Sequence, residues 1–234
     1  MERKKNAKGA ELARRSLRIA LVLITGLAGA QEKKVPKVVP VPPLPPISRE
    51  APKPPPEPTN PPAQTVEDER THVVFHLPPG WNVSRRDGEL STFRLDARTA
   101  PARSDLRVAA SLNFNPFPRS TFSGAMFYLS VVPRSSAAAC AAETTAKPEK
   151  PLPAAIVGDV KFARGKDEHG HICTESRDVA YTAFRGGSCV RFDLAVNSFC
   201  GGEVSGAQDL TEAQLGSLFN RMEGILGTVE FRGK

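Results

Sequence analysis

The stretch Val179–Leu194, VAYTAFRGGSCVRFDL, decides how this chain folds. The Gly-Gly pair at its centre suits the two-residue turn of a β-hairpin, and this turn sets the register of the strands on both sides, Ile172–Arg185 and Ser188–Phe199. One face of the resulting pair is apolar: Ala183 lies opposite Val190, Tyr181 opposite Phe192, and Val179 opposite Leu194. The other face is more polar: Thr182 lies opposite Arg191, and Ala180 opposite Asp193. The pattern predicts an antiparallel pair with one buried face.

Apolar residues predict further strands on the N-terminal side of this hairpin. The expected ranges are Val73–Leu77, Trp81–Val83, Ser91–Leu95, Leu106–Phe114, Met126–Val132 and Ile156–Ala163. Pro116 and Pro133 end two of them, because proline has no N–H to donate to a sheet. The alanine-rich stretch Ser135–Thr145 predicts a helix, and Trp81 is expected to fill the core.

The C-terminal part predicts an amphipathic helix. Thr211 and Gln214 have the spacing of a capping box. Apolar residues follow at helical spacing: Leu215, Leu218, Phe219, Met222, Ile225 and Leu226. Gly227 is expected to end the helix in a left-handed conformation, and Thr228–Phe231 to form a last strand. Together these elements predict one α+β domain at residues 71–234, an antiparallel sheet with helices packed on it.

The N-terminus has the order of a secretory signal. Seven basic residues precede an apolar run of 12 residues, Ile19–Ala30, which ends in Ala-Gly-Ala. This order predicts a signal peptide at residues 1–30 that is cleaved before Gln31. The run is shorter than the roughly 20 residues that cross a bilayer, and the alternative is an uncleaved membrane anchor at residues 17–30. We therefore expect an extracytoplasmic protein, periplasmic or secreted.

Residues 31–70 have the composition of an unfolded linker. Thirteen of the chain's 22 prolines lie between residues 31 and 64, and no aromatic residue occurs between Gln31 and Arg70. Such a segment cannot bury enough apolar surface to offset the entropy of ordering it. We expect a disordered, proline-rich spacer; the alternative is a docking peptide, because Pro-x-x-Pro patterns bind aromatic grooves.

The net charge of +7 is concentrated in the expected signal peptide. Residues 1–30 carry a net charge of +5, residues 31–70 are neutral, and residues 71–234 carry +2. Without its signal the chain is nearly balanced, so its charge gives no reason to expect a nucleic acid partner. A membrane is an expected partner only if the signal segment is retained.

Four cysteines, an even number in an exported chain, predict two disulfide bonds. The register of the hairpin brings Cys173 opposite Cys200, at a hydrogen-bonded position that needs a local twist or bulge. Cys189 lies near the turn, about 35 Å along the strand from Cys200, which is too far for a disulfide. We therefore predict the pairs Cys173–Cys200 and Cys140–Cys189, the second of which ties the expected helix to the more polar face of the hairpin.

Sequence motifs for catalysis are missing. The nucleophile elbow, the dinucleotide and phosphate loops, His-Glu-x-x-His and Cys-x-x-Cys do not occur, so we predict no catalytic residue and no cofactor. One cluster remains: His169, His171 and Cys173 share one side of a strand and are residue types that bind copper or zinc. If Cys173 is in a disulfide, two histidines leave a tetrahedral site incomplete, and the stretch is an exposed turn.

The stretch Phe75–Trp81, FHLPPGW, resembles the F-x-L-P-x-G-W opening of PsbP-like and Mog1-like domains, a group with an exported bacterial branch. The closing helix and strand, up to Phe231, are also similar to those of this group. The resemblance covers about residues 71–233 and implies an α/β/α sandwich. The group has no common catalytic site, and its members are mostly binding or assembly factors. The four cysteines depart from the plant photosystem members, so that role is not implied.

These observations favour a non-enzymatic binding or assembly domain, presented on a proline-rich stalk, that holds a protein or a component of the cell envelope. The first alternative is a metal-binding module that uses His169 and His171. The second alternative is a hydrolase whose site follows no recognisable motif.

Overall fold

The computed structural model describes residues 56–144, 151–200 and 206–233. The expected signal peptide and most of the expected linker lie outside this part. None of the helices in the described residues has the length and apolar character that a membrane span requires.

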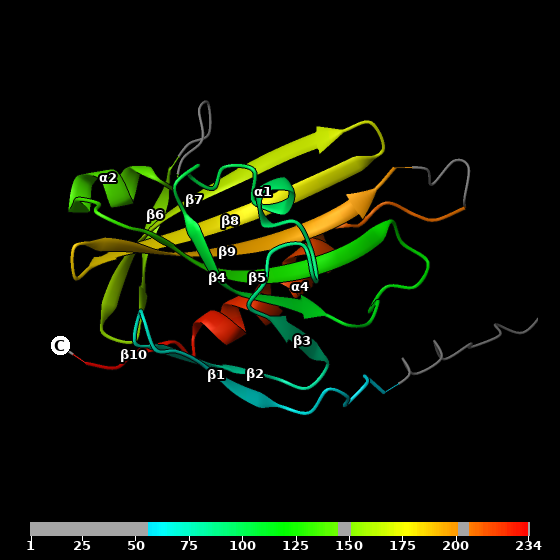
Figure 1. Ribbon diagram of the computed structural model, residues 1–234. Coiled ribbons are helices and arrows are strands. Elements are labelled where there is room, and N and C mark those ends of the chain that lie inside the picture. Colours follow the sequence, from blue (N-terminus) through cyan, green and yellow to red (C-terminus); the bar gives the residue numbers. More distant parts are fainter. Residues whose placement is uncertain (1–55, 145–150, 201–205, 234) are drawn as a thin grey trace, which may run out of the picture. The chain divides into compact units, whose positions relative to one another are not determined.

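The described chain forms two antiparallel sheets (Figure 1). The large sheet has the strand order β3-β4-β5-β9-β8-β7-β6, and the small sheet has the order β1-β2-β10. The strands are β1 (Gln64–Asp68), β2 (Val73–Leu77), β3 (Trp81–Ser84), β4 (Asp105–Leu112), β5 (Phe122–Val132), β6 (Pro151–Val157), β7 (Val160–His171), β8 (Thr174–Arg185), β9 (Ser188–Phe199) and β10 (Glu230–Phe231). The helices are α1 (Phe93–Asp96), α2 (Ala137–Ala142) and α4 (Glu212–Leu226).

The hairpin predicted from the Gly-Gly turn is the β8–β9 pair of the large sheet. Its register is the predicted one: Ala183 pairs with Val190, Tyr181 with Phe192, and Val179 with Leu194. β9 also pairs with β5 along its other edge, so it is hydrogen-bonded on both sides. The expectation of only one buried face is wrong, because Thr182, Arg191 and Asp193 on the second face are also buried.

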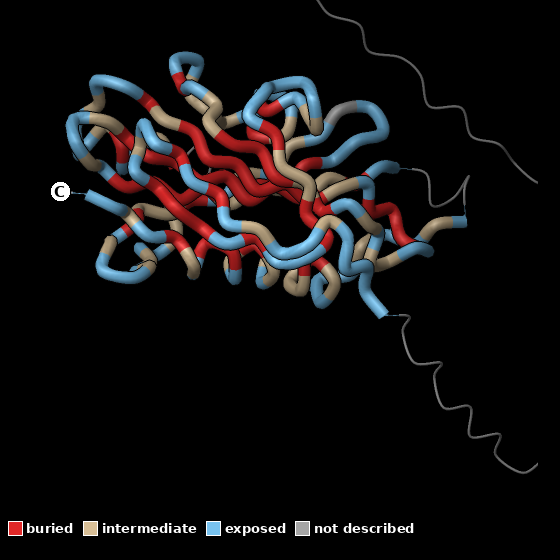
Figure 2. The backbone as a smooth tube through the Cα atoms, turned by 60° about the horizontal axis from the view of Figure 1, so that its bottom comes forward, coloured by how far each residue is buried: buried red, intermediate tan, exposed pale blue. Residues whose placement is uncertain are grey.

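One face of the large sheet packs against α4 and the small sheet (Figure 1). The predicted apolar stripe of α4 is buried except for Phe219, which is partly buried, and the capping box of Thr211 and Gln214 is present. The ring of Phe127 lies 5.3 Å from that of Phe75 and 5.7 Å from that of Phe192, between ring centroids. Trp81 is 1% exposed, as predicted for a core residue. Figure 2 shows the strands of this core as the most continuously buried part of the chain.

The second face of the large sheet is covered by α1, α2 and the loops beside them (Figure 1). Phe93 of α1 packs edge-on against Tyr128 of β5, with ring centroids 4.9 Å apart. The Thr182 hydroxyl of β8 donates a hydrogen bond to the Cys140 carbonyl of α2 at 2.8 Å. Helices therefore lie on both faces of an antiparallel sheet, which is the predicted α+β architecture.

Three predictions of local structure are wrong. Ser91–Leu95 is not a strand but contains the start of α1 at Phe93, because so short an apolar pattern does not distinguish a strand from a helical turn. Ile156–Ala163 is not one strand, because the chain turns at Gly158, with φ of 60°, between β6 and β7. Gly227 ends α4 in the right-handed region, with φ of −62°.

The ordered domain begins earlier than predicted. β1 lies inside the segment that we assigned to the linker, and it pairs with β2 from Gln64 opposite Leu77 to Asp68 opposite Val73. Asp68 is 1% exposed. Burial raises the pKa of its carboxyl, but hydrogen bonds, foremost from Arg107, hold it below the usual value. The linker boundary at residue 70 is therefore wrong: the neighbouring prolines masked a short strand that begins at residue 64.

Candidate functional site

The structure joins the cysteines in the expected pairs. Cys140 is bonded to Cys189 with a Cα–Cα distance of 5.2 Å, and Cys173 to Cys200 with a Cα–Cα distance of 4.4 Å. The first disulfide fastens α2 to β9, and the second fastens the β7–β8 turn to the end of β9. The sequence suggested that Cys173 lies in a strand. The structure places it in this turn instead, with φ of 66°.

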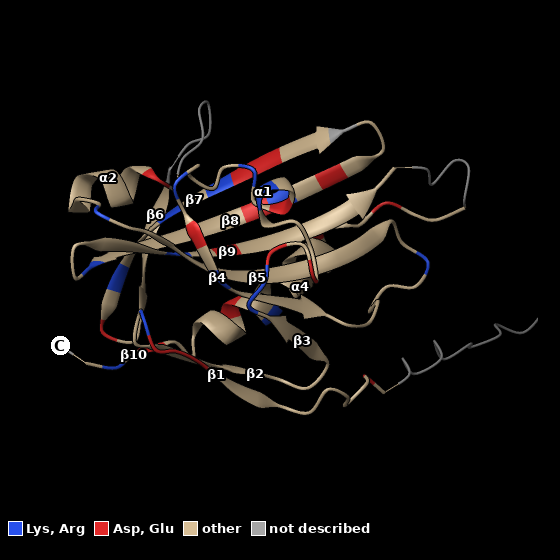
Figure 3. Ribbon diagram, in the orientation of Figure 1, with Lys and Arg blue, Asp and Glu red and all other residues tan. Residues whose placement is uncertain are grey.

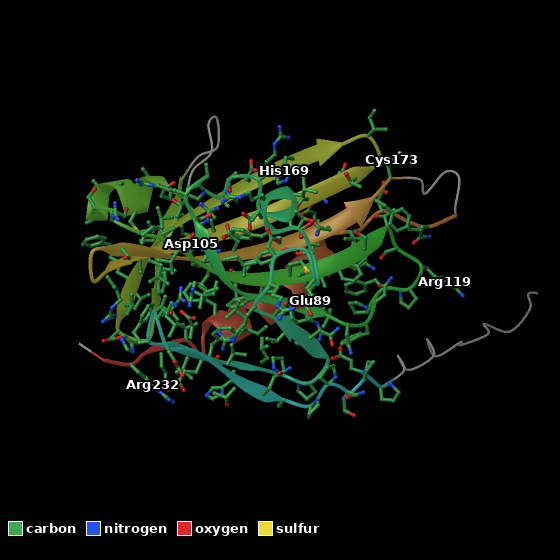
Figure 4. The ribbon with its side chains drawn as sticks, in the orientation of Figure 1. Glu89, Asp105, Arg119, His169, Cys173 and Arg232 are labelled. Atoms are coloured by element: carbon green, nitrogen blue, oxygen red, sulfur yellow. A yellow bond between two sulfur atoms is a disulfide. The ribbon has the colours of Figure 1, made fainter. Side chains whose placement is uncertain are left out.

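His169 lies on β7 beside α1 (Figure 4). Its Nδ1 is 2.9 Å from Oδ2 of Asp167, and its Nε2 is 3.3 Å from the Leu95 carbonyl oxygen. His171 ends β7, and its side chain lies outside the described residues. Because Cys173 is in a disulfide, it offers no thiolate to a metal. Among the described residues, no group of three or more His, Cys, Asp or Glu side chains could hold a metal ion.

A cleft of about 280 Å³, which we call the α1 cleft, opens beside His169. Asp96 in this cleft is held by three neighbours. Its carboxylate accepts hydrogen bonds from Asn197 at 2.8 Å and from the Tyr128 hydroxyl at 2.5 Å, and its carbonyl accepts one from Ser176 at 2.9 Å. Burial and the charge on Asp96 raise the pKa of Tyr128, so its hydroxyl remains a donor. The cleft thus presents polar groups in fixed positions.

The pair of Asp167 and His169 resembles the base and the orienting carboxylate of a catalytic triad. The third member is missing, because Nε2 of His169 faces the Leu95 carbonyl, which has no proton to give. In the part of the chain that the structure describes, no hydroxyl or thiol is hydrogen-bonded to this ring. Both partners of the ring, a carboxylate and a carbonyl, only accept hydrogen bonds, so neither contact offers the ring a proton to take up. The pair fastens α1 to β7.

A buried charge cluster lies on the same face of the sheet. The Arg191 side chain is fully buried, and its Nε donates to both carboxylate oxygens of Asp193, at 2.8 and 3.0 Å. It also donates to the Thr99 hydroxyl at 2.9 Å and to the Glu143 carbonyl, on two different covering segments. Burial, together with the charge on Asp193, raises the pKa of Asp178 well above its usual value. Because the cluster is closed to solvent, it holds the layers together rather than contacting a ligand.

A second cleft, of about 300 Å³, lies at the other end of the domain, and we call it the arginine cleft. Three arginines line it: Arg70 from the β1–β2 turn, Arg185 from the end of β8, and Arg232 from the segment after β10. Figure 4 shows Arg232 and His169 at opposite ends of the domain. The sequence did not reveal this site, because the three arginines are far apart in the chain and no motif connects them.

No protein-family model and no curated protein matches the chain. Among solved structures, it is similar to PsbP (CyanoP) of the cyanobacterium Synechocystis, with 12% identity, a TM-score of 0.40, and coverage of 72% of this chain and 92% of that chain. The Ran-binding protein Mog1p of Saccharomyces cerevisiae is 9% identical, with a TM-score of 0.38 and coverage of 72% and 95%. LpqN of Mycobacterium tuberculosis, involved in cell envelope biogenesis, is 8% identical, with a TM-score of 0.33 and coverage of 71% and 88%. PsbP and Mog1p are the namesakes of the group that Phe75–Trp81 resembles, and at these values the similarity concerns the fold alone.

Proposed function

We propose that this chain is a non-enzymatic binding domain that acts outside the cytoplasm and holds a protein or another component of the cell envelope. The proline-rich segment before β1 is proposed to present the domain at a distance from its point of attachment. About 30 extended residues at about 3.1 Å each reach roughly 90 Å.

The hydrogen bonding of His169 carries this proposal. A hydrolase that used His169 as its base would need a ring nitrogen that accepts a proton from a nucleophile, and a metal site on His169 would need a free nitrogen lone pair. In this structure both ring nitrogens lie within hydrogen-bonding distance of acceptors of the chain itself, the Asp167 carboxylate and the Leu95 carbonyl. This arrangement does not favour a hydrolase or a metal site centred on His169, and a binding role is the proposal that remains.

The two disulfides support a location outside the cytoplasm, because disulfides persist in oxidising compartments. The order within residues 1–30, in which basic residues precede an apolar run, agrees with this location. N-terminal sequencing of the exported protein tests the location directly. We expect the mature chain to start at Gln31, and an intact Met1 would favour the anchored alternative instead.

The binding proposal is tested by affinity capture from envelope extract with the exported chain as bait, followed by a binding assay with the purified partner. A peptide of residues 31–63 serves as a second bait, because it separates binding by the domain from docking of the proline-rich segment. We expect a partner that binds the whole chain and not the peptide, no turnover with a panel of hydrolase substrates, and no heat on titration with zinc or copper. Turnover without any specific partner would refute the proposal, and stoichiometric metal binding would favour the metal-binding alternative.

A further inference from the structure

We propose that the arginine cleft binds an acidic segment of the partner polypeptide, in which carboxylates flank an apolar side chain. This inference rests on the proposed function and adds the surface and the chemistry of the partner. Three separate parts of the chain enclose the cleft: the β1–β2 turn, the tip of the β8–β9 hairpin and the residues after β10. Figure 3 shows basic positions in each of these parts, at the same end of the domain.

The arginines of the cleft keep most of their hydrogen-bonding capacity for a ligand. Among the described residues, neither Arg70 nor Arg185 forms an ion pair. The guanidinium of Arg185 lies over the ring of Phe231, 4.6 Å from its centroid, which positions the cation without using its N–H groups. The nitrogens of Arg232 are 3.8 Å from two glutamate carboxylates. Such long, exposed ion pairs are weak and can be exchanged for a ligand.

An apolar floor lies between the arginines. Val131 and Val190 of the large sheet and Phe231 of the small sheet line it, and Val190 is 4% exposed. The volume of about 300 Å³ is at the lower end of the range for ligand sites and suits one apolar side chain. Carboxylates on both sides of that side chain would then meet guanidinium groups, which bind carboxylates through two parallel hydrogen bonds.

Backbone hydrogen bonds hold the walls of the cleft in place. The N–H of Ser135 donates to the Gly187 carbonyl at the tip of the hairpin at 3.0 Å. The N–H of Arg232 donates to the His72 carbonyl in the β1–β2 turn at 2.7 Å. The cleft is therefore preformed, so binding has little backbone to order.

Acidic residues around the cleft favour a polypeptide over an anionic membrane. Glu67 and Glu230 flank Arg232, and Glu69 precedes Arg70 in its turn. A flat bilayer would bring its phosphates against these carboxylates as well as against the arginines. Segments that bind such bilayers also hold about four to eight basic residues, more than this cleft offers. A narrow peptide can place each carboxylate on an arginine and avoid the glutamates.

The test uses the exported full chain and a fluorescein-labelled peptide, Gly-Glu-Asp-Phe-Glu-Asp-Gly, in an anisotropy titration. The control peptide has Gln and Asn in place of Glu and Asp. The cleft variant combines Arg70→Gln, Arg185→Gln and Arg232→Gln. The control variant combines Arg86→Gln, Arg98→Gln and Arg119→Gln, which remove the same charge from exposed arginines outside the cleft.

We expect the acidic peptide to bind the wild type, with an affinity that falls as salt is added. The cleft variant should bind at least about tenfold more weakly, and the control variant within about twofold of the wild type. Equal unfolding midpoints by tryptophan fluorescence show that both variants are folded. Unchanged binding by the cleft variant would overturn the inference, and so would an equal loss in both variants, because charge alone would then explain binding.

Two further outcomes separate this inference from its alternatives. Binding to phosphatidylglycerol vesicles in preference to the peptide, lost in the cleft variant, would replace the polypeptide with a membrane. A purified partner that binds the wild type and the cleft variant equally would remove the cleft from the proposed function and leave that function standing. The absence of any specific partner would refute the proposed function itself.

Discussion

Replacing Arg191 by methionine tests how the second face of the sheet is closed. The guanidinium of Arg191 pairs with Asp193, and both side chains are fully buried. Methionine keeps an unbranched apolar chain at this position but leaves the Asp193 carboxylate buried without its counter-charge. The change also removes the hydrogen bonds to Thr99 and to the Glu143 carbonyl, which fasten two covering segments to the sheet.

The expected loss of stability is large. Removing one partner of a buried ion pair costs about 3–5 kcal/mol, because the remaining charge stays desolvated. For a domain of this size, 1 kcal/mol corresponds to about 2–4 °C, so the melting temperature should fall by roughly 6–20 °C. Removing both charges costs much less. The double variant Arg191→Met/Asp193→Leu should therefore be more stable than Arg191→Met alone.

The chain's one tryptophan, Trp81, is 1% exposed and reports unfolding by fluorescence. Guanidinium titrations without reductant give the free energy of unfolding of the wild type, both single variants and the double variant. These four values give the coupling between positions 191 and 193. The reasoning is refuted if Arg191→Met loses less than about 1 kcal/mol, the range of an exposed ion pair, or if the two single losses simply add in the double variant.

Three further predictions concern the same layers. Replacing Cys140 and Cys189 by alanine removes a disulfide that joins residues 49 positions apart. The free energy of unfolding, measured by denaturant titration, should fall by about 4 kcal/mol, because the unfolded chain gains the entropy of the open loop; a fall below about 1 kcal/mol would contradict this. Asp178→Asn should become increasingly more stable than the wild type as the pH of the titration rises. The pKa of Asp178 is raised in the folded protein, so above the ordinary pKa of aspartate the unfolded wild type ionises before the folded one and the folded state loses stability; a difference independent of pH would contradict the assignment. Gly165→Ala should lower the melting temperature, because its Cβ would collide with backbone just after α2, whereas Gly124→Ala, with open space around it, should not.

The β8–β9 hairpin was predictable in detail because its information is local. A two-residue turn fixes the register, and the alternation of side chains then decides which residues share a face. The same register leads to the cysteine pairing, since it places Cys173 opposite Cys200 and leaves Cys140 for Cys189. The α4 capping box was predictable for a similar reason, because Thr211 and Gln214 meet within one helical turn.

The α1 cleft was only partly predictable. The sequence indicated that His169 lies on a strand and made it a candidate metal ligand, but it did not reveal the partners of the ring. Asp167 was within reach of sequence reasoning, because residues two apart in a strand lie on one face. The Leu95 carbonyl was not, because the sequence suggested a strand where α1 begins. Arg191 and Asp193 are also two residues apart in an apolar strand, so their side chains lie on one face. This pattern indicates a buried ion pair once that face is known to be covered.

The sequence by itself determined the units of this protein: the hairpin and its register, the final helix and the disulfide pairing. All but one depend on residues that are neighbours along the chain or across one turn, and the pair Cys140–Cys189 follows because the hairpin register pairs the other two cysteines. Tertiary structure alone decided that both faces of the large sheet are covered, and that Arg70, Arg185 and Arg232 share one cleft. The periodicity of apolar residues indicates which side chains share a face of a strand or helix. It does not indicate which distant segment packs over that face, because that depends on the packing of the whole chain.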